Sequence, residues 1–71
     1  MASHRVMSHR TDISILGEGV RAACLDAARL AYEDAGIRGL CAEARWEVAL
    51  GAIRQLDLSS IVESIKRESA D

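Results

Sequence analysis

The 71-residue sequence contains no proline and no phenylalanine, and its only aromatic side chains are one tryptophan and one tyrosine. The lack of proline removes the residue that most strongly breaks helix interiors. Twelve alanines and many aliphatic residues remain to form the packed surfaces, and such small side chains favour helices in close contact. This composition predicts an all-α protein.

The sequence also lacks a long apolar segment and a cysteine pattern. No run approaches the roughly 18 residues of a membrane span, and the first residues are polar rather than the apolar core of a signal peptide. Cys24 and Cys41, with His4 and His9, show neither disulfide-framework nor metal-ligand spacing. We therefore expect a soluble cytoplasmic protein with no cofactor, no metal and two small, buried, unpaired cysteines.

Charge is unevenly distributed along the chain. Residues 1–11 carry Arg5 and Arg10 without an acidic residue, so residues 12–71 hold the other seven of nine basic side chains against all eleven acidic ones. A weakly acidic body argues against nucleic acid as the main partner. Because residues 1–11 also repeat Ser-His-Arg and contain few apolar residues, we expect a disordered tail over 1–11 and a single helical domain over 12–71.

Apolar residues recur at steps of three and four after the capping residues Thr11 and Asp12, which predicts a first helix over 13–35. Gly36 is the residue type that adopts the left-handed conformation at a helix C-terminus, and we expect the helix to stop there. The residues of the predicted stripe are Ile13, Leu16, Val20, Ala23, Ala27 and Leu30.

Two shorter helices are predicted after the connection 36–39. The segment 40–56 is apolar over a wide arc, which indicates burial on more than one side, and 58–67 has one apolar edge after the capping residue Asp57. A short connection makes consecutive helices antiparallel. The expected fold is thus an antiparallel helical hairpin plus a short third helix. Because a chain this short has a thin core of its own, we expect oligomerisation to complete it.

No pattern in the sequence indicates catalysis. Glu33 and Asp34 are adjacent on a predicted helix and therefore point in different directions, and no histidine or lysine is placed to activate either cysteine thiol. The glycines of 36–39 lack the preceding strand and the Gly-Lys-Ser/Thr signature of a phosphate-binding loop. We expect no enzyme activity.

The expected function is that of a helical protein–protein interaction module with a regulatory, adaptor or inhibitory role, whose partner is a second copy or a larger protein. Two alternatives remain: a helix-turn-helix-like DNA-binding regulator formed by residues 45–67, and a small accessory subunit of an enzyme with a reactive thiol. The residues predicted for the partner interface are Trp46, Leu50, Ile53, Leu58, Ile61 and Ile65.

Residues 30–58, LAYEDAGIRGLCAEARWEVALGAIRQLDL, contain Tyr32-Glu33-Asp34-Ala35-Gly36, Gly39-Leu40-Cys41 and Trp46-Glu47. This stretch resembles a recurring segment of short uncharacterised bacterial helical proteins, some of which carry an automatic acetyltransferase label. The resemblance implies a bacterial helical protein and supplies no catalytic residue. An acetyltransferase of the common type needs a mixed α/β domain about twice this long and a pyrophosphate-binding loop, which this sequence lacks.

Overall fold

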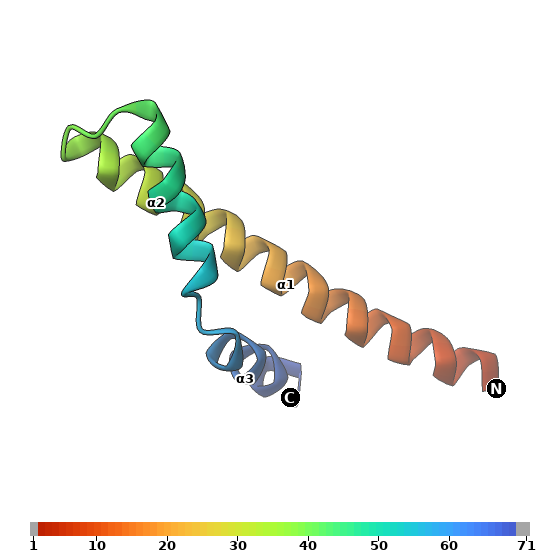
Figure 1. The fold of residues 1–71 in the computed structure, drawn as a ribbon. Helices are drawn as coiled ribbons and strands as arrows, with labels where there is room; N and C mark the ends of the chain where they lie inside the picture. Colours follow the sequence, from red (N-terminus) through yellow and green to blue (C-terminus); the bar gives the residue numbers. More distant parts are fainter. Residues whose placement is uncertain (1, 70–71) are drawn as a thin grey trace.

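The computed structural model describes the backbone of residues 2–69 and the side chains of residues 13–68. In this range the chain forms three α-helices and no strand: α1 (Ala2–Ile37), α2 (Ala42–Arg54) and α3 (Leu58–Ser69) (Figure 1). The prediction of an all-α hairpin followed by a third helix is confirmed.

Helix α1 begins at Ala2, so the predicted start at residue 13 was wrong. Residues 2–12 contain neither proline nor glycine, and nothing in this segment therefore interrupts the helical backbone. The division into a disordered tail, 1–11, and a helical domain, 12–71, stays a prediction, because Met1 and the side chains of 2–12 lie outside the described residues.

The turn between α1 and α2 is built around Gly39. Its φ is +87°, a left-handed conformation that costs glycine little. The Gly39 N–H donates to the Gly36 carbonyl at 3.0 Å, and the Leu40 N–H donates to the Ala35 carbonyl at 3.0 Å. This pair of bonds is a Schellman motif, which satisfies the last carbonyls of α1. The prediction that Gly36 ends the helix was therefore wrong, and α1 continues to Ile37.

Helix α2 is shorter at both ends than the predicted segment 40–56. Cys41 is its N-cap residue, with extended backbone (φ −72°, ψ 167°) and no side-chain capping bond. The side chain of Cys41 is exposed, which corrects the expectation that both cysteines are buried, whereas Cys24 is half-buried. At the other end of α2 the Leu56 N–H donates to the Ile53 carbonyl at 3.2 Å. This bond joins residues three apart, as in a 3₁₀ turn, and it narrows the last turn of the helix.

Helix α3 starts where the sequence predicts. The Ser60 N–H donates to Oδ1 of Asp57 at 3.2 Å, so Asp57 caps the helix as expected. Lys66 and Arg67 lie in its last turn, where the helix dipole favours positive charge.

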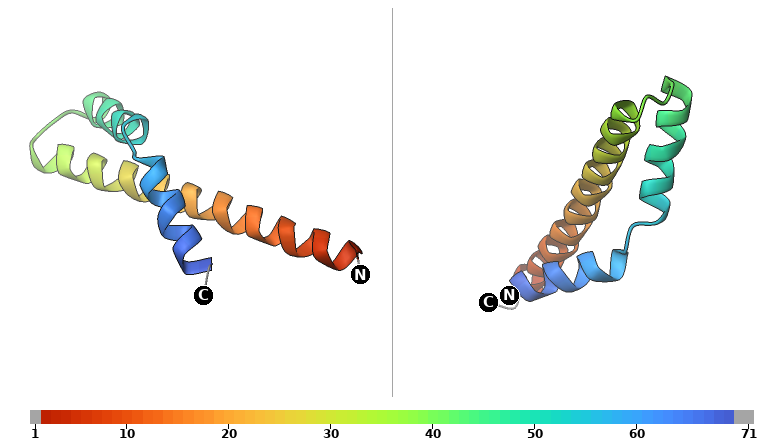
Figure 2. Two further views of the ribbon diagram at one scale, coloured as in Figure 1. Left: turned by 90° about the horizontal axis from the view of Figure 1, so that it is seen from below. Right: turned by 90° about the vertical axis from the view of Figure 1, so that its left-hand side faces the viewer.

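Both short helices pack on α1 and, among the described helices, not on each other. Helix α2 runs back antiparallel to the C-terminal half of α1, and α3 crosses α1 further toward its N-terminus (Figure 2). The N-terminal part of α1 projects beyond this crossing, and the molecule measures 57 × 20 × 15 Å. None of the described helices combines the length and the apolar character required to cross a membrane.

The core between α1 and α2 consists of small side chains. Of the described residues, only Ala35 and Ala49 are buried, with 0% and 4% of their surface exposed. Alanines at a helix contact allow the backbones to approach closely, but they bury little apolar area. The packing of this single chain therefore leaves larger apolar side chains at the surface.

Candidate interaction surface

Arg45 of α2 joins the two helices of the hairpin next to the turn. Its Nε donates to the carbonyl oxygen of Leu40 at 2.7 Å, and its guanidinium carbon lies 5.9 Å from the centre of the Tyr32 ring. The first contact is a charge-assisted hydrogen bond in a half-buried position, and the second has the geometry of a cation–π interaction. Arg45 thus fixes α2 to the turn and to α1.

Gly36 provides the space for this guanidinium. A Cβ atom at Gly36 would lie 3.1 Å from Nη1 and 3.2 Å from Cζ of Arg45, which is closer than ordinary van der Waals contact. The two glycines near the turn therefore have different functions. Gly39 supplies the left-handed backbone, and Gly36 allows the close approach of Arg45.

Helix α1 carries one row of large exposed side chains beside its contact with α2. Leu25 and Tyr32 are seven residues apart, which places them on the same side of the helix two turns apart. Each follows directly after a half-buried residue, Cys24 or Ala31. The row therefore lies next to the packed face of α1 and turns away from it toward solvent.

Helix α2 carries a matching row. Trp46 and Ile53 are again seven residues apart, and each follows directly after a half-buried residue, Arg45 or Ala52. Trp46 is 58% exposed although it is the largest apolar side chain in the sequence. The contact with α1 thus leaves most of the indole uncovered.

The two rows lie on the same side of the hairpin. Two antiparallel helices are related by a two-fold axis perpendicular to the plane that contains both helix axes. This axis leaves the two sides of the plane unchanged, so the residue that directly follows a packed residue points to the same side of the hairpin in both helices. The contact of Arg45 with the Tyr32 ring brings the two rows together at the turn end. We call this surface the Trp46 face; it consists of Leu25, Tyr32, Trp46 and Ile53.

The opposite side of the hairpin is less continuous. Leu30 lies directly before the half-buried Ala31, and the 85% exposed Ile37 lies seven residues further along α1, so helix periodicity turns both away from the Trp46 face. The matching positions of α2, one residue before the packed Arg45 and Ala52, are Ala44 and Gly51. Because the exposed large apolar residues of α2, Trp46 and Ile53, both lie on the Trp46 face, this is the side of the hairpin on which large apolar residues of both helices are exposed.

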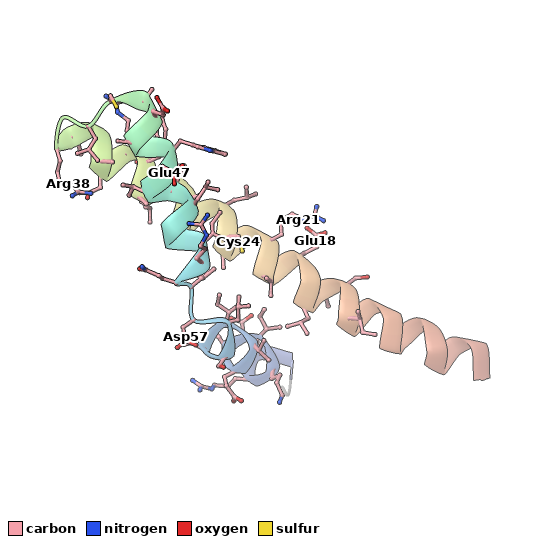
Figure 3. All side chains as sticks on the ribbon, viewed as in Figure 1. Glu18, Arg21, Cys24, Arg38, Glu47 and Asp57 are labelled. Carbon is pink, nitrogen blue, oxygen red and sulfur yellow. The ribbon has the colours of Figure 1, made fainter. Side chains whose placement is uncertain are left out.

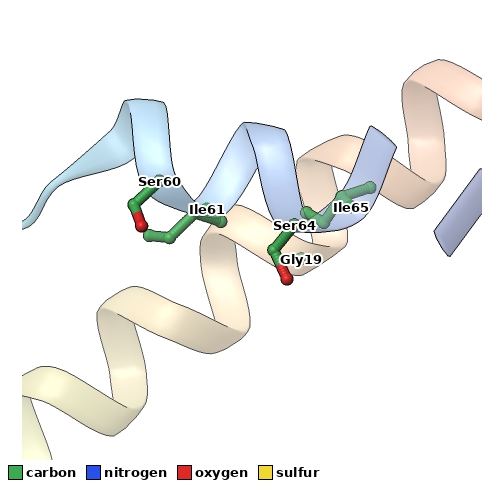
Figure 4. A pocket seen from close by; sticks show the side chains of 5 residues that line it. All are labelled: Gly19, Ser60, Ile61, Ser64 and Ile65. Carbon is green, nitrogen blue, oxygen red and sulfur yellow. The ribbon is translucent and has the colours of Figure 1, made fainter. Parts of the chain in front are cut away.

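The crossing of α3 over α1 forms a shallow groove of 290 Å³. Ile61 and Ile65 of α3 point toward α1 beside Gly19, and Ser60 and Ser64 line the rest (Figure 4). A Cβ atom at Gly19 would overlap the end of the Ile65 side chain, so the glycine permits this approach. Ile61 and Ile65 are half-buried as a result.

The six residues predicted for the partner interface therefore do not form one surface. Trp46, Leu50 and Ile53 share one edge of α2, whereas Ile61 and Ile65 are occupied by the crossing with α1, and Leu58 is exposed at the start of α3. The interface predicted from the sequence does not include Leu25, Tyr32 or Arg45. For Arg45 a signal existed, because it is a charged residue within the apolar arc of α2, four residues from Cys41 and from Ala49.

Most of the described charges of α1 pair within the helix. Arg21 lies 3.6 Å from Glu18, and Arg29 contacts Asp26 at 2.8 Å and Glu33 at 3.2 Å. The hydrogen bond that Arg29 donates to Asp26, followed by the one that it donates to Glu33, raises the pKa of Arg29 above its ordinary value. Figure 3 shows the pair Glu18 and Arg21 on the outer surface of α1, where solvent reduces its contribution to stability.

Arg38 makes a similar exposed pair with Asp34 at 3.0 Å. Within the described side chains, His, Cys, Asp and Glu form no group of three that could hold a metal ion. His4 and His9 lie outside the described side chains. The acidic side chains of α1 that the structure describes are thus partners of arginines along the helix rather than members of a convergent cluster.

The chain matches no family model, no curated protein and no solved structure in the three comparisons made. The resemblance of residues 30–58 to short bacterial helical proteins therefore stays a prediction.

Proposed function

We propose that this chain is a small helical protein–protein interaction module with a regulatory, adaptor or inhibitory role and without catalysis of its own. One observation supports the proposal: large apolar side chains stay exposed in adjacent rows on the hairpin, while the only buried residues among those described are two alanines. Contiguous exposed apolar surface is typical of interaction sites, and tryptophan and tyrosine are enriched among the residues that dominate binding energy.

The distribution of charge favours a protein partner over a nucleic acid. Helix α2 has two acidic and two basic side chains, Glu43, Glu47, Arg45 and Arg54, so it forms no basic stripe. Helices α2 and α3 pack separately on α1, and this arrangement does not support a helix-turn-helix unit, whose two helices pack on each other. The unpaired thiols of Cys24 and Cys41 are compatible with action in the cytoplasm, which we include in the proposal.

A photocrosslinking amino acid at Leu25 tests the proposal in cells that produce the full chain. Leu25 is 65% exposed on the Trp46 face, and we expect it to form a covalent adduct with a protein. The matched control is the same amino acid at Ile37, which is also apolar, exposed and on α1 but faces the other side. Adducts at position 25 and not at 37 would support an interaction module, whereas no adduct at position 25 would contradict it.

A further inference from the structure

We infer that α3 is a hinged helix: when its contact with α1 is lost, the joint at residues 55–57 becomes helical, and α3 continues α2 as one straight helix over residues 42–69. This joint lies outside the Trp46 face, so the inference does not depend on the proposed function. Three features of the chain support it: the backbone of the joint, the spacing of the apolar residues on either side of it, and the contacts that hold α3.

The break between α2 and α3 is weaker than the break between α1 and α2. Gly39 forms the first turn with a left-handed φ of +87°, and no other residue that the structure describes has a positive φ. At the second break, Gln55 ends α2 with φ −93° and ψ 1°, which lies next to the right-handed helical region. Residues 52–69 contain neither glycine nor proline. The residue types of this joint therefore permit a continuous helix.

The apolar residues before and after the joint are half a helical turn out of phase. Three buried or half-buried residues of the segment 49–56 each precede an apolar residue of α3 by nine positions: Ala49 and Leu58, Ala52 and Ile61, and Leu56 and Ile65. Nine residues make about two and a half turns of a helix, so a continuous helix would turn the apolar edge of α3 away from α1. The docked α3 and the straight helix therefore exclude each other, and the joint has two discrete arrangements.

Two kinds of contact hold α3 in the docked arrangement. Ile61 and Ile65 pack on α1 beside Gly19, at the groove in Figure 4. The Ser60 N–H donates to Oδ1 of Asp57, which caps the helix only if α3 begins there. Every hydrogen bond and ion pair of the described side chains lies within the hairpin or within this cap. The docking of α3 on α1 thus depends on apolar contact.

The cost of helix nucleation favours the straight arrangement over unfolding once α3 is released. Helix α3 has 12 residues, and an isolated helix of this length is marginal in water because its first turn must be nucleated. A helix that continues from Arg54 extends an existing helix and needs no new nucleus. Straightening also provides the N–H groups of residues 57–59 with carbonyl acceptors four residues earlier. At the start of a separate helix these groups have no acceptor within the helix.

The first measurement removes the apolar contact from the full chain. Ile61→Ala combined with Ile65→Ala deletes the side chains that pack on α1 and keeps strong helix formers in α3. Protection of the amides of residues 57–59 against hydrogen exchange, followed by nuclear magnetic resonance, should rise at least about tenfold, and helical circular dichroism should be retained. The matched control combines Glu63→Ala with Lys66→Ala, two exposed positions of the same helix, and should leave this protection unchanged.

Two results of this first measurement would overturn the inference. One is protection of residues 57–59 that does not rise, or that rises equally in the control. The other is a loss of protection throughout α3 together with a loss of helical circular dichroism, because α3 would then unfold on release instead of extending α2.

The second measurement blocks the straight arrangement. Proline suits the first position of a helix but not a helix interior, because it has no N–H and its ring clashes with the carbonyl four residues earlier. Leu58 is the first residue of α3 and would be interior in the straight helix. Leu58→Pro, added to Ile61→Ala and Ile65→Ala, should therefore abolish the rise in protection at Asp57 and Ser59. A rise that persists would contradict the straight helix.

The third measurement acts on the cap and keeps Ile61 in place, so it decides if the double-alanine chain does not fold. Asp57→Ala combined with Ile65→Ala removes the cap that only the docked arrangement contains. Asp57→Asn combined with Ile65→Ala is the control, because asparagine also caps helices. Protection of residues 57–59 should be higher in the chain with Asp57→Ala. Equal protection in the two chains would overturn the inference.

Discussion

The contact of α1 with α2 and the contact of α1 with α3 both depend on small residues, but they are built differently. In the hairpin, Ala35 and Ala49 are buried and Arg45 adds a hydrogen bond to the turn. At the crossing, the side chain of Ile65 packs against the backbone of Gly19. The hairpin thus has several independent restraints, whereas α3 is held mainly by one apolar edge. We expect the hairpin to be the stable unit and α3 to detach first.

The largest effect is expected from filling the helix contact of the hairpin. Ala35→Leu adds three carbon atoms where no surface is exposed, and it should lower the free energy of unfolding by about 3 kcal/mol through overpacking. Ala22→Leu is the control, because Ala22 is exposed on the same helix and should change stability by less than about 0.5 kcal/mol. Urea denaturation followed by circular dichroism measures both. Equal losses would show that Ala35 is not at a tight contact.

The next largest effect is expected at Arg45. Arg45→Ala removes the charge-assisted hydrogen bond to Leu40 and the contact with the Tyr32 ring, and it should cost about 1–2 kcal/mol of unfolding free energy. Arg54→Ala removes an exposed arginine of the same helix and should cost less than about 0.5 kcal/mol. The same denaturation experiment separates the two. A neutral Arg45→Ala would mean that the hairpin does not depend on this contact.

Gly39 and Gly51 should respond to alanine with opposite signs. At Gly39 the φ of +87° strains any residue with a Cβ, so Gly39→Ala should cost about 1 kcal/mol. At Gly51 no described atom lies within 4 Å of an added Cβ, so Gly51→Ala should stabilise α2 by about 0.5–1 kcal/mol. The difference in melting temperature between the two variants checks this. The same sign for both would contradict the Schellman turn at Gly39.

The smallest expected effect compares Gly17 and Gly19 at the crossing. Gly17→Ala has open space and should stabilise α1 by about 0.5–1 kcal/mol. Gly19→Ala should gain nothing net, because its methyl group displaces the flexible end of Ile65. Thermal unfolding gives both values, and amide exchange in α3 should rise only for Gly19→Ala. Equal stabilisation would show that α3 does not pack at Gly19.

The periodic apolar pattern was enough to predict the helices and their order, because helix type follows from local spacing. The helix ends depend on more. Gly36 and Gly39 are both of the residue type that ends helices. The backbone hydrogen bonds of the turn place the helix end before Gly39, and Gly36 lies within the helix beside Arg45. The contact of Ile65 with α1 was not predictable either, because Gly19 lies 46 residues earlier in the sequence.

The candidate surface was predictable only in its α2 half. Trp46 and Ile53 are conspicuous in the sequence as large apolar residues on a broad helix. Leu25 and Tyr32 lie on the same side as these residues only because of how α1 is oriented about its own axis when it packs on α2. The apolar pattern of a single helix does not predict this orientation. Ile61 and Ile65 show the converse, since an apolar edge that looked free is used within the chain.

Amide hydrogen exchange at low and high protein concentration tests most directly whether the hairpin, rather than α3, carries the interaction surface. Protection of α2 and of α1 around Leu25 and Tyr32 should increase with concentration, while protection of α3 should change little. An increase confined to α3 would contradict the placement of the surface on the Trp46 face.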